Sequence, residues 1–148
     1  FAVGSDEHRV HPEIERRIDV SAKRVSKNVA SVFEGTGLAD WLRTAGIDTV
    51  TLTGYMTNNC VLASAAAAEP LGFAVEVLSD ATGAIPISND SGSASAAQVH
   101  DTLMAVLNSN WAAVATTAAW ADAVETGATL PRGNLIESAI AGRAAAQR

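Results

Sequence analysis

The feature that most constrains the fold is an alternation of strand-like and helix-like runs along the chain. Residues 47–53 and 73–78 are rich in β-branched and apolar residues, as expected of buried strands. Between them, residues 57–69 are rich in Ala and have high helix propensity, and this helix is predicted to end at Pro70 and Gly72. A strand, a helix and a second strand at these spacings predict a βαβ unit, in which the two strands are parallel.

The following segments extend the same pattern. A loop is predicted over residues 81–95, because Gly, Ser, Asn and Asp dominate it. Apolar residues then recur at helical spacing from Val99 to Leu107, and a strand over 111–116 and a helix over 117–126 follow. The chain is therefore predicted to have an α/β fold, with a parallel sheet covered by helices on both faces in a Rossmann-like three-layer sandwich.

The two ends of the chain give weaker patterns. Residues 18–25 are compatible with a short strand, and Thr36 is predicted to cap a helix that ends at Gly46. We expect one domain over residues 1–128, followed by a tail helix within 129–148.

Length, charge and cysteine content narrow the class of protein. The 148 residues suffice for one domain, and no apolar run approaches the roughly 20 residues that span a bilayer. The net charge is −6, and the Lys and Arg residues near the start of the chain are interleaved with Asp and Glu, which argues against a nucleic-acid partner. The single cysteine allows no internal disulfide and suits a reducing compartment, so we expect a cytoplasmic protein without membrane contacts.

Reactive groups in parallel sheets gather at the carboxyl ends of the strands, which directs attention to residues 54–60 and 79–84. Cys60 follows the first predicted strand and falls in the first turn of the next helix, with Asn58 or Asn59 as a possible cap. The helix dipole and the unpaired N–H groups there favour a thiolate and can bind an oxyanion. The alternative is that Cys60 is a small buried apolar residue.

The three histidines give no comparable signal. His8 and His11 have metal-ligand spacing but no third ligand nearby, and His100 lies beside the predicted buried face of its helix, where a structural role is expected. No metal and no cofactor are therefore predicted.

Two segments together resemble the isochorismatase-like cysteine hydrolases. One is residues 54–61, GYMTNNCV, followed by the Ala-rich helix, Gly72-Phe73 and Asp80-Ala81. The other is the upstream run with Lys27, Ser31, Phe33, Gly35-Thr36 and Leu38, preceded by His11-Pro12-Glu13-Ile14. The resemblance covers roughly residues 8–125.

This resemblance implies a catalytic Asp, Lys and Cys set that acts on amides. It assigns Cys60 as the nucleophile and Lys27 as its cationic partner, in preference to Lys23, which lacks the family spacing. It also implies a non-proline cis peptide at Tyr55–Met56, with the N–H groups of Met56 and Cys60 directed at the oxyanion.

Two further expectations concern the pocket and the acid. Phe33, Tyr55 and Met56 either line the substrate pocket or pack in the core. The family's Asp ends the first strand in an Asp-x-Gln type motif, which this sequence lacks, and Asp6 lies too close to Lys27 to match it. The chain starts in an apolar stretch without Met, so we expect the N-terminal strand or strands to be missing.

These observations favour a cysteine amidohydrolase that cleaves the C–N bond of a small amide through a thioester on Cys60. One alternative is a catalytically inactive binding or assembly protein with the isochorismatase fold. Another is a redox-responsive thiol, although no second cysteine exists to resolve a sulfenic acid. A small-molecule substrate and a homo-oligomer are expected, with Leu135, Ile136 and Ile140 of the tail helix as a candidate subunit contact.

Overall fold

Three strands of apolar and β-branched residues form a parallel sheet at the centre of the chain. A computed structural model describes residues 2–147 and places these strands in the order β1 (Thr49–Tyr55), β2 (Ala74–Gly83) and β5 (Ala112–Ala115). Val50 of β1 pairs with Val75 of β2, which in turn pairs with Ala112 of β5. The strands thus run side by side in sequence order, with β2 in the middle.

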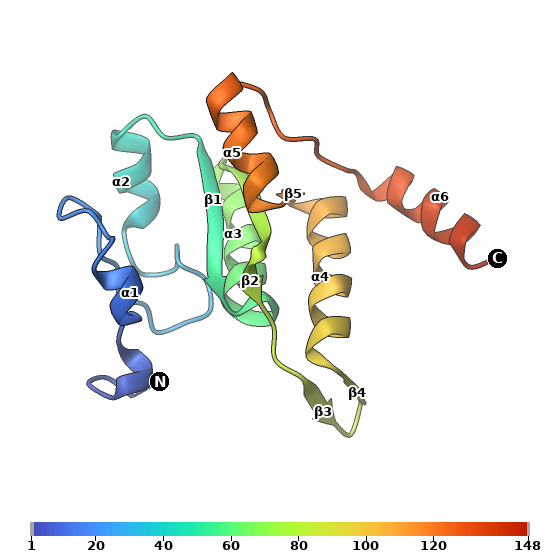
Figure 1. Ribbon diagram of the computed structural model, residues 1–148, viewed down its shortest axis with the longest axis horizontal. Helices are drawn as coiled ribbons and strands as arrows, with labels where there is room; N and C mark the ends of the chain where they lie inside the picture. Colours follow the sequence, from blue (N-terminus) through green and yellow to red (C-terminus); the bar gives the residue numbers. More distant parts are fainter. Residues whose placement is uncertain (1, 148) are drawn as a thin grey trace.

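Helices cover both faces of this sheet, as the sequence predicted. Helix α3 (Leu62–Leu71) joins β1 to β2, helix α4 (Ala96–Asn110) joins β2 to β5, and these two helices contact each other. Helix α5 (Thr117–Thr126) follows β5 and packs on β2. In Figure 1, α5 lies in front of the strands and α3 lies behind them, which gives the predicted three-layer arrangement.

The core lies between the sheet and helices α3 and α4. Val77 of β2, Ala65 and Ala68 of α3 and Leu107 of α4 are completely buried. The short Ala side chains allow α3 to approach the strands closely, so the high helix propensity and the packing of this segment have one origin. Among residues 2–147, no helix is both long enough and apolar enough to cross a membrane.

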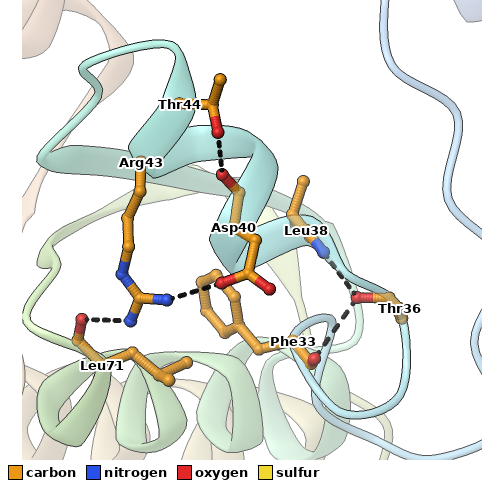
Figure 2. Close-up of polar contacts among 7 residues, drawn as sticks. All are labelled: Phe33, Thr36, Leu38, Asp40, Arg43, Thr44 and Leu71. Carbon is orange, nitrogen blue, oxygen red and sulfur yellow. Dashed lines mark hydrogen bonds and ion pairs between the residues drawn. The ribbon is translucent and has the colours of Figure 1, made fainter.

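Helix α2 (Leu38–Thr44) begins differently from the prediction. Gly37 is the N-cap, with φ of 68°, and Thr36 lies one residue outside the helix. The Thr36 hydroxyl donates to the Val32 carbonyl at 2.6 Å. It also lies 3.3 Å from the Phe33 carbonyl and accepts from the Leu38 N–H at 3.2 Å (Figure 2). Thr36 therefore closes the turn before the helix, while Gly37 adopts the left-handed conformation with which α2 begins.

An arginine fastens α2 to the end of α3. The Arg43 guanidinium donates to Asp40 at 3.0 Å and to the Leu71 carbonyl at 2.9 Å (Figure 2). It also lies 5.5 Å from the centre of the Phe73 ring. Because the last carbonyls of a helix have no intrahelical donor, this contact satisfies one of them and aligns the two helices.

The short strand expected over residues 18–25 is absent, so that prediction is wrong. The N-terminal segment instead contains η1 (Asp6–His8), α1 (Pro12–Glu15) and irregular chain. A bidentate pair between Arg24 and Glu15, at 2.7 and 3.1 Å, folds this chain back onto α1. Asp19 accepts from the Ser21 N–H and creates a turn within the predicted strand.

The predicted loop over residues 81–95 is also partly wrong. Strand β2 continues to Gly83, and β3 (Ile87–Asn89) and β4 (Gly92–Ala94) form an antiparallel hairpin. Apart from Ile87 and Ala94, the hairpin residues are Gly, Ser and Asn and are exposed, so the hairpin lacks the apolar alternation that marks a half-buried strand. The tail helix α6 (Leu135–Ala145) forms as predicted and extends away from the sheet (Figure 1).

Candidate active site

Cys60 lies in a tight turn, here called the Cys60 turn (residues 55–61), that connects the carboxyl end of β1 to α3. The Tyr55–Met56 peptide bond is cis, and a single π-helical turn, η2 (Thr57–Val61), follows it. The Met56 carbonyl accepts from the N–H groups of Asn59 at 3.1 Å and Val61 at 3.3 Å. Isolated π turns of this kind recur at functional sites, and this one places a half-buried thiol at a helix entrance.

Lys27 approaches Cys60 from an irregular segment far away in the sequence. Its ammonium lies 3.2 Å from the Cys60 sulfur and donates to the Val29 carbonyl at 2.9 Å. The segment is anchored to α3, because the Val32 N–H donates to the buried Ser64 hydroxyl at 3.0 Å. A positive charge at this distance stabilises a thiolate, so the pair has the arrangement that an activated cysteine requires.

Two consecutive side chains tie the Cys60 turn to the rest of the fold. Thr57 is completely buried, and its hydroxyl lies 3.1 Å from Nδ1 of His100 on α4. The Asn58 side chain accepts from the Ile85 N–H at 3.3 Å, in the segment after β2. Neither Asn58 nor Asn59 caps a helix, as one of them was predicted to do, because the turn begins at Met56 without a side-chain cap.

The sequence predicts a structural role for His100 and none for Thr57. The contact between them joins residues 43 positions apart, and no motif in the sequence marks it. A threonine with a fully buried side chain three positions before the cysteine is the structural signal that reveals it.

The three candidate pocket residues are in different environments. Phe33 is buried and stacks on Phe73, with 5.6 Å between ring centres. Of the two alternatives predicted for Phe33, pocket lining or core packing, the structure shows core packing. Tyr55 has an exposed fraction of 59%, and Met56 is half-buried in the Cys60 turn. Phe33 is thus a core residue, whereas Tyr55 and Met56 lie at the beginning of the Cys60 turn.

A shallow groove of about 390 Å³ lies beside the Cys60 turn. Asn58 and Leu62 form one wall, and residues of the β3–β4 hairpin and α4 form the other: Ile87, Ala94, Gln98, Val99, Thr102 and Leu103. Cys60 is not one of its lining residues, so this groove is separate from the pair of Lys27 and Cys60.

The described residues supply no carboxylate partner for Lys27 or Cys60. Among residues 2–147, no Asp or Glu side chain forms a hydrogen bond or ion pair with Cys60 or Lys27. Asp6 pairs with Arg9 at 3.1 Å. The same residues contain no cluster of three or more His, Cys, Asp or Glu side chains that would hold a metal ion.

Asp80, at the second strand end singled out by the sequence, supports the fold. Its carboxylate accepts from the Thr117 N–H at 2.7 Å and from the Thr117 hydroxyl at 2.8 Å. These two donors lower the pKa of the Asp80 carboxyl, with the backbone N–H having the larger effect. Asp80 thus stabilises the beginning of α5.

The sequence and the fold of this chain are similar to those of known proteins. Residues 1–119 match the family model described as the isochorismatase domain. A crystal structure of a proposed isochorismatase from Burkholderia xenovorans LB400 superposes with a TM-score of 0.92 at 43% sequence identity, over 100% of this chain and 70% of that one.

Two curated proteins match shorter regions. The uncharacterised isochorismatase family protein YrdC of Bacillus subtilis is 34% identical over 94 residues, which is 63% of this chain and 50% of that protein. Maleamate amidohydrolase of Pseudomonas putida is 42% identical over 59 residues, which is 40% of this chain and 28% of that protein. The matched regions therefore span half or less of the length of these relatives.

Proposed function

Because this chain belongs to the isochorismatase family, we propose that it acts as a cysteine amidohydrolase that cleaves the C–N bond of a small amide. The observation that carries the proposal is the distance of 3.2 Å between the Lys27 ammonium and the Cys60 sulfur. A lysine at this distance from a half-buried thiol at a helix entrance favours the nucleophilic thiolate.

The proposed reaction proceeds through a thioester. The Cys60 sulfur attacks the amide carbonyl carbon, and the backbone N–H groups of Met56 and Cys60 bind the resulting oxyanion. Collapse of the tetrahedral intermediate breaks the C–N bond, and the leaving amine takes up a proton. Water then attacks the thioester carbonyl, which releases a carboxylic acid and restores the thiol.

An acid is needed to protonate the leaving amine and a base to activate the water. The resemblance to the family assigns both steps to an Asp at the end of the family's first strand. We propose that Lys27 stabilises the negative charge on the sulfur before attack, while Tyr55 and Met56 contact the substrate.

Two observations support a small amide as the substrate class. A thiolate held beside an ammonium suits attack on an uncharged carbonyl, for which no metal is required. The relationship to a maleamate amidohydrolase suggests primary amides of small organic acids, so these compounds should be tested first.

A second candidate function is a catalytically inactive binding or assembly protein. It is favoured by the lack of any carboxylate in contact with Cys60 or Lys27 among residues 2–147. Such a protein would retain the fold and the groove beside the Cys60 turn but would not turn over an amide.

The test is ammonia release from a panel of small primary amides that includes maleamate, measured for the unchanged chain and for Cys60→Ala and Cys60→Ser. We expect release only with Cys60 present, together with an acyl adduct in the intact mass of rapidly quenched samples. Because Cys60 is the only cysteine, the adduct is assigned without ambiguity. A fully active Cys60→Ala protein would refute the proposal, and no release from any amide would favour the second candidate.

A further inference from the structure

A buried polar contact joins the Cys60 turn to helix α4. The Thr57 hydroxyl has no exposure to solvent, and Nδ1 of His100 lies 3.1 Å from it. A hydroxyl can donate or accept, so either tautomer of the imidazole maintains this contact. Buried polar groups are rarely left unpaired, and among residues 2–147 His100 is the side chain that pairs with this hydroxyl.

The location of this contact relates it to the sulfur. Thr57 begins the π-helical turn that carries Cys60, so a displacement of Thr57 moves the sulfur with it. The preceding residue, Met56, closes the same turn through its carbonyl. His100 belongs to α4, whose Leu107 is fully buried in the core, so the contact ties the turn to a rigid element.

The partner of the sulfur is held by a different part of the chain. Lys27 comes from an irregular, exposed segment, and its ammonium is shared between the sulfur and the Val29 carbonyl. Because the ammonium is also held at the Val29 carbonyl, a displacement of the Cys60 turn changes the distance of 3.2 Å between ammonium and sulfur. Small displacements of this kind change reactivity strongly, because attack requires the reacting atoms in a narrow range of geometries.

We propose that His100 is a positioning residue for the Cys60 nucleophile and acts through the Thr57 hydroxyl. The inference rests on the proposed function, in which Cys60 is the reactive group. It assigns His100 no contact with the substrate and no proton transfer. Its role is to hold the first residue of the π-helical turn so that the sulfur faces Lys27.

The experiment measures the rate at which iodoacetamide alkylates Cys60 in the folded protein, a reaction that needs no substrate. Thr57→Val removes the hydroxyl at almost unchanged shape, and His100→Ala removes its partner. His100→Asn is the conservative variant, because its amide can reach the place of Nδ1. Thr102→Val on the same helix is the matched control, since Thr102 is exposed and its hydroxyl forms no hydrogen bond among residues 2–147. Circular dichroism verifies that each variant is folded.

We expect Thr57→Val and His100→Ala each to slow alkylation about threefold or more, with His100→Asn and Thr102→Val close to the unchanged chain. The double variant should be no slower than the slower single variant, because both changes remove one contact. A purely structural contact would lower the melting temperature and leave the alkylation rate of the folded protein unchanged.

Folded His100→Ala protein that is alkylated as fast as the unchanged chain, or faster, would overturn the inference. His100 is only half-buried, so this variant remains informative if Thr57→Val does not fold. The two proposals can fail separately. If no amide in the panel is turned over, the proposed reaction is contradicted, but the effect of His100 on alkylation can still be observed. Turnover that depends on Cys60 and is unaffected in His100→Ala removes only the positioning role.

Discussion

Replacement of Lys27 by Met tests whether its charge activates Cys60. The substitution keeps an unbranched apolar side chain of similar length and removes the ammonium that lies 3.2 Å from the sulfur. Lys27→Arg retains a positive charge at the same position. Lys23→Met is the matched control, because Lys23 lies four positions away in the same exposed segment and forms no hydrogen bond with Cys60.

The size of the effect follows from the distance. Two unit charges 3.2 Å apart attract by about 1.3 kcal/mol in water and about 5 kcal/mol at the effective dielectric constant typical of protein surfaces. Lys27 is exposed and Cys60 is half-buried, so an intermediate attraction of about 2.6 kcal/mol applies. This energy corresponds to a factor of roughly 80 in an equilibrium constant. A less stabilised thiolate is a better nucleophile, and this offsets about half of the effect on a logarithmic scale. The net expectation is an alkylation rate lowered about tenfold.

The assay compares neutral iodoacetamide with anionic iodoacetate near pH 7, with the mass of the intact chain as the readout. Loss of Lys27 should slow iodoacetate more than iodoacetamide, because the ammonium also attracts the anionic reagent. Added salt should reduce the difference between the reagents in the unchanged chain and have less influence in Lys27→Met.

Either of two results would refute this reasoning. Lys27→Met could be alkylated as fast as the unchanged chain by both reagents, in which case the short contact has no electrostatic effect on the sulfur. Alternatively, Lys23→Met could slow alkylation as much as Lys27→Met, which would show a general effect of surface charge.

Three further predictions concern stability and assembly. Leu107→Ala removes a fully buried side chain, so the free energy of unfolding should fall by about 3 kcal/mol and the melting temperature by roughly 6 to 12 °C; a loss below about 1 kcal/mol in urea titration would contradict the described packing of α4. The Thr117 donors hold the pKa of Asp80 below its ordinary value of 3.8, so its stabilisation is complete above pH 3.8 and is lost as the pH falls through the lower folded value. Urea midpoints from pH 6 to pH 2 should show this loss, and Asp80→Asn should lack that part of the pH dependence. We also propose that the exposed helix α6 contacts another subunit, so removal of residues 129–148 should lower the oligomer mass in light scattering; an unchanged mass would reject this role.

The central βαβ units were predictable because their signals are local. β-branched runs mark β1 and β2, and the Ala-rich run between them marks α3, which ends at Gly72 with φ of 82°. Strand β1 begins two residues later than predicted, at Thr49, because register with β2 rather than propensity sets its first residue.

The errors lie where local signals were weak or ambiguous. The polar hairpin of β3 and β4 forms by pairing with itself, and its composition resembles that of a loop. Among residues 2–147, no strand lies beside the apolar residues within 18–25, so a turn and a surface ion pair determine their conformation. Strand formation requires a partner, which the sequence of a single segment does not specify.

The position of Cys60 at a strand end and helix entrance was determined by the sequence alone, because hydrophobic periodicity and helix breakers locate both boundaries. The pairing of Lys27 with this residue was implied by the resemblance, but the distance between them is a property of the packed fold. Only the tertiary structure placed Phe33 in the core and brought His100 to Thr57, 43 positions away. Local sequence governs which face of an element is apolar, whereas contacts between distant side chains depend on how the layers pack together.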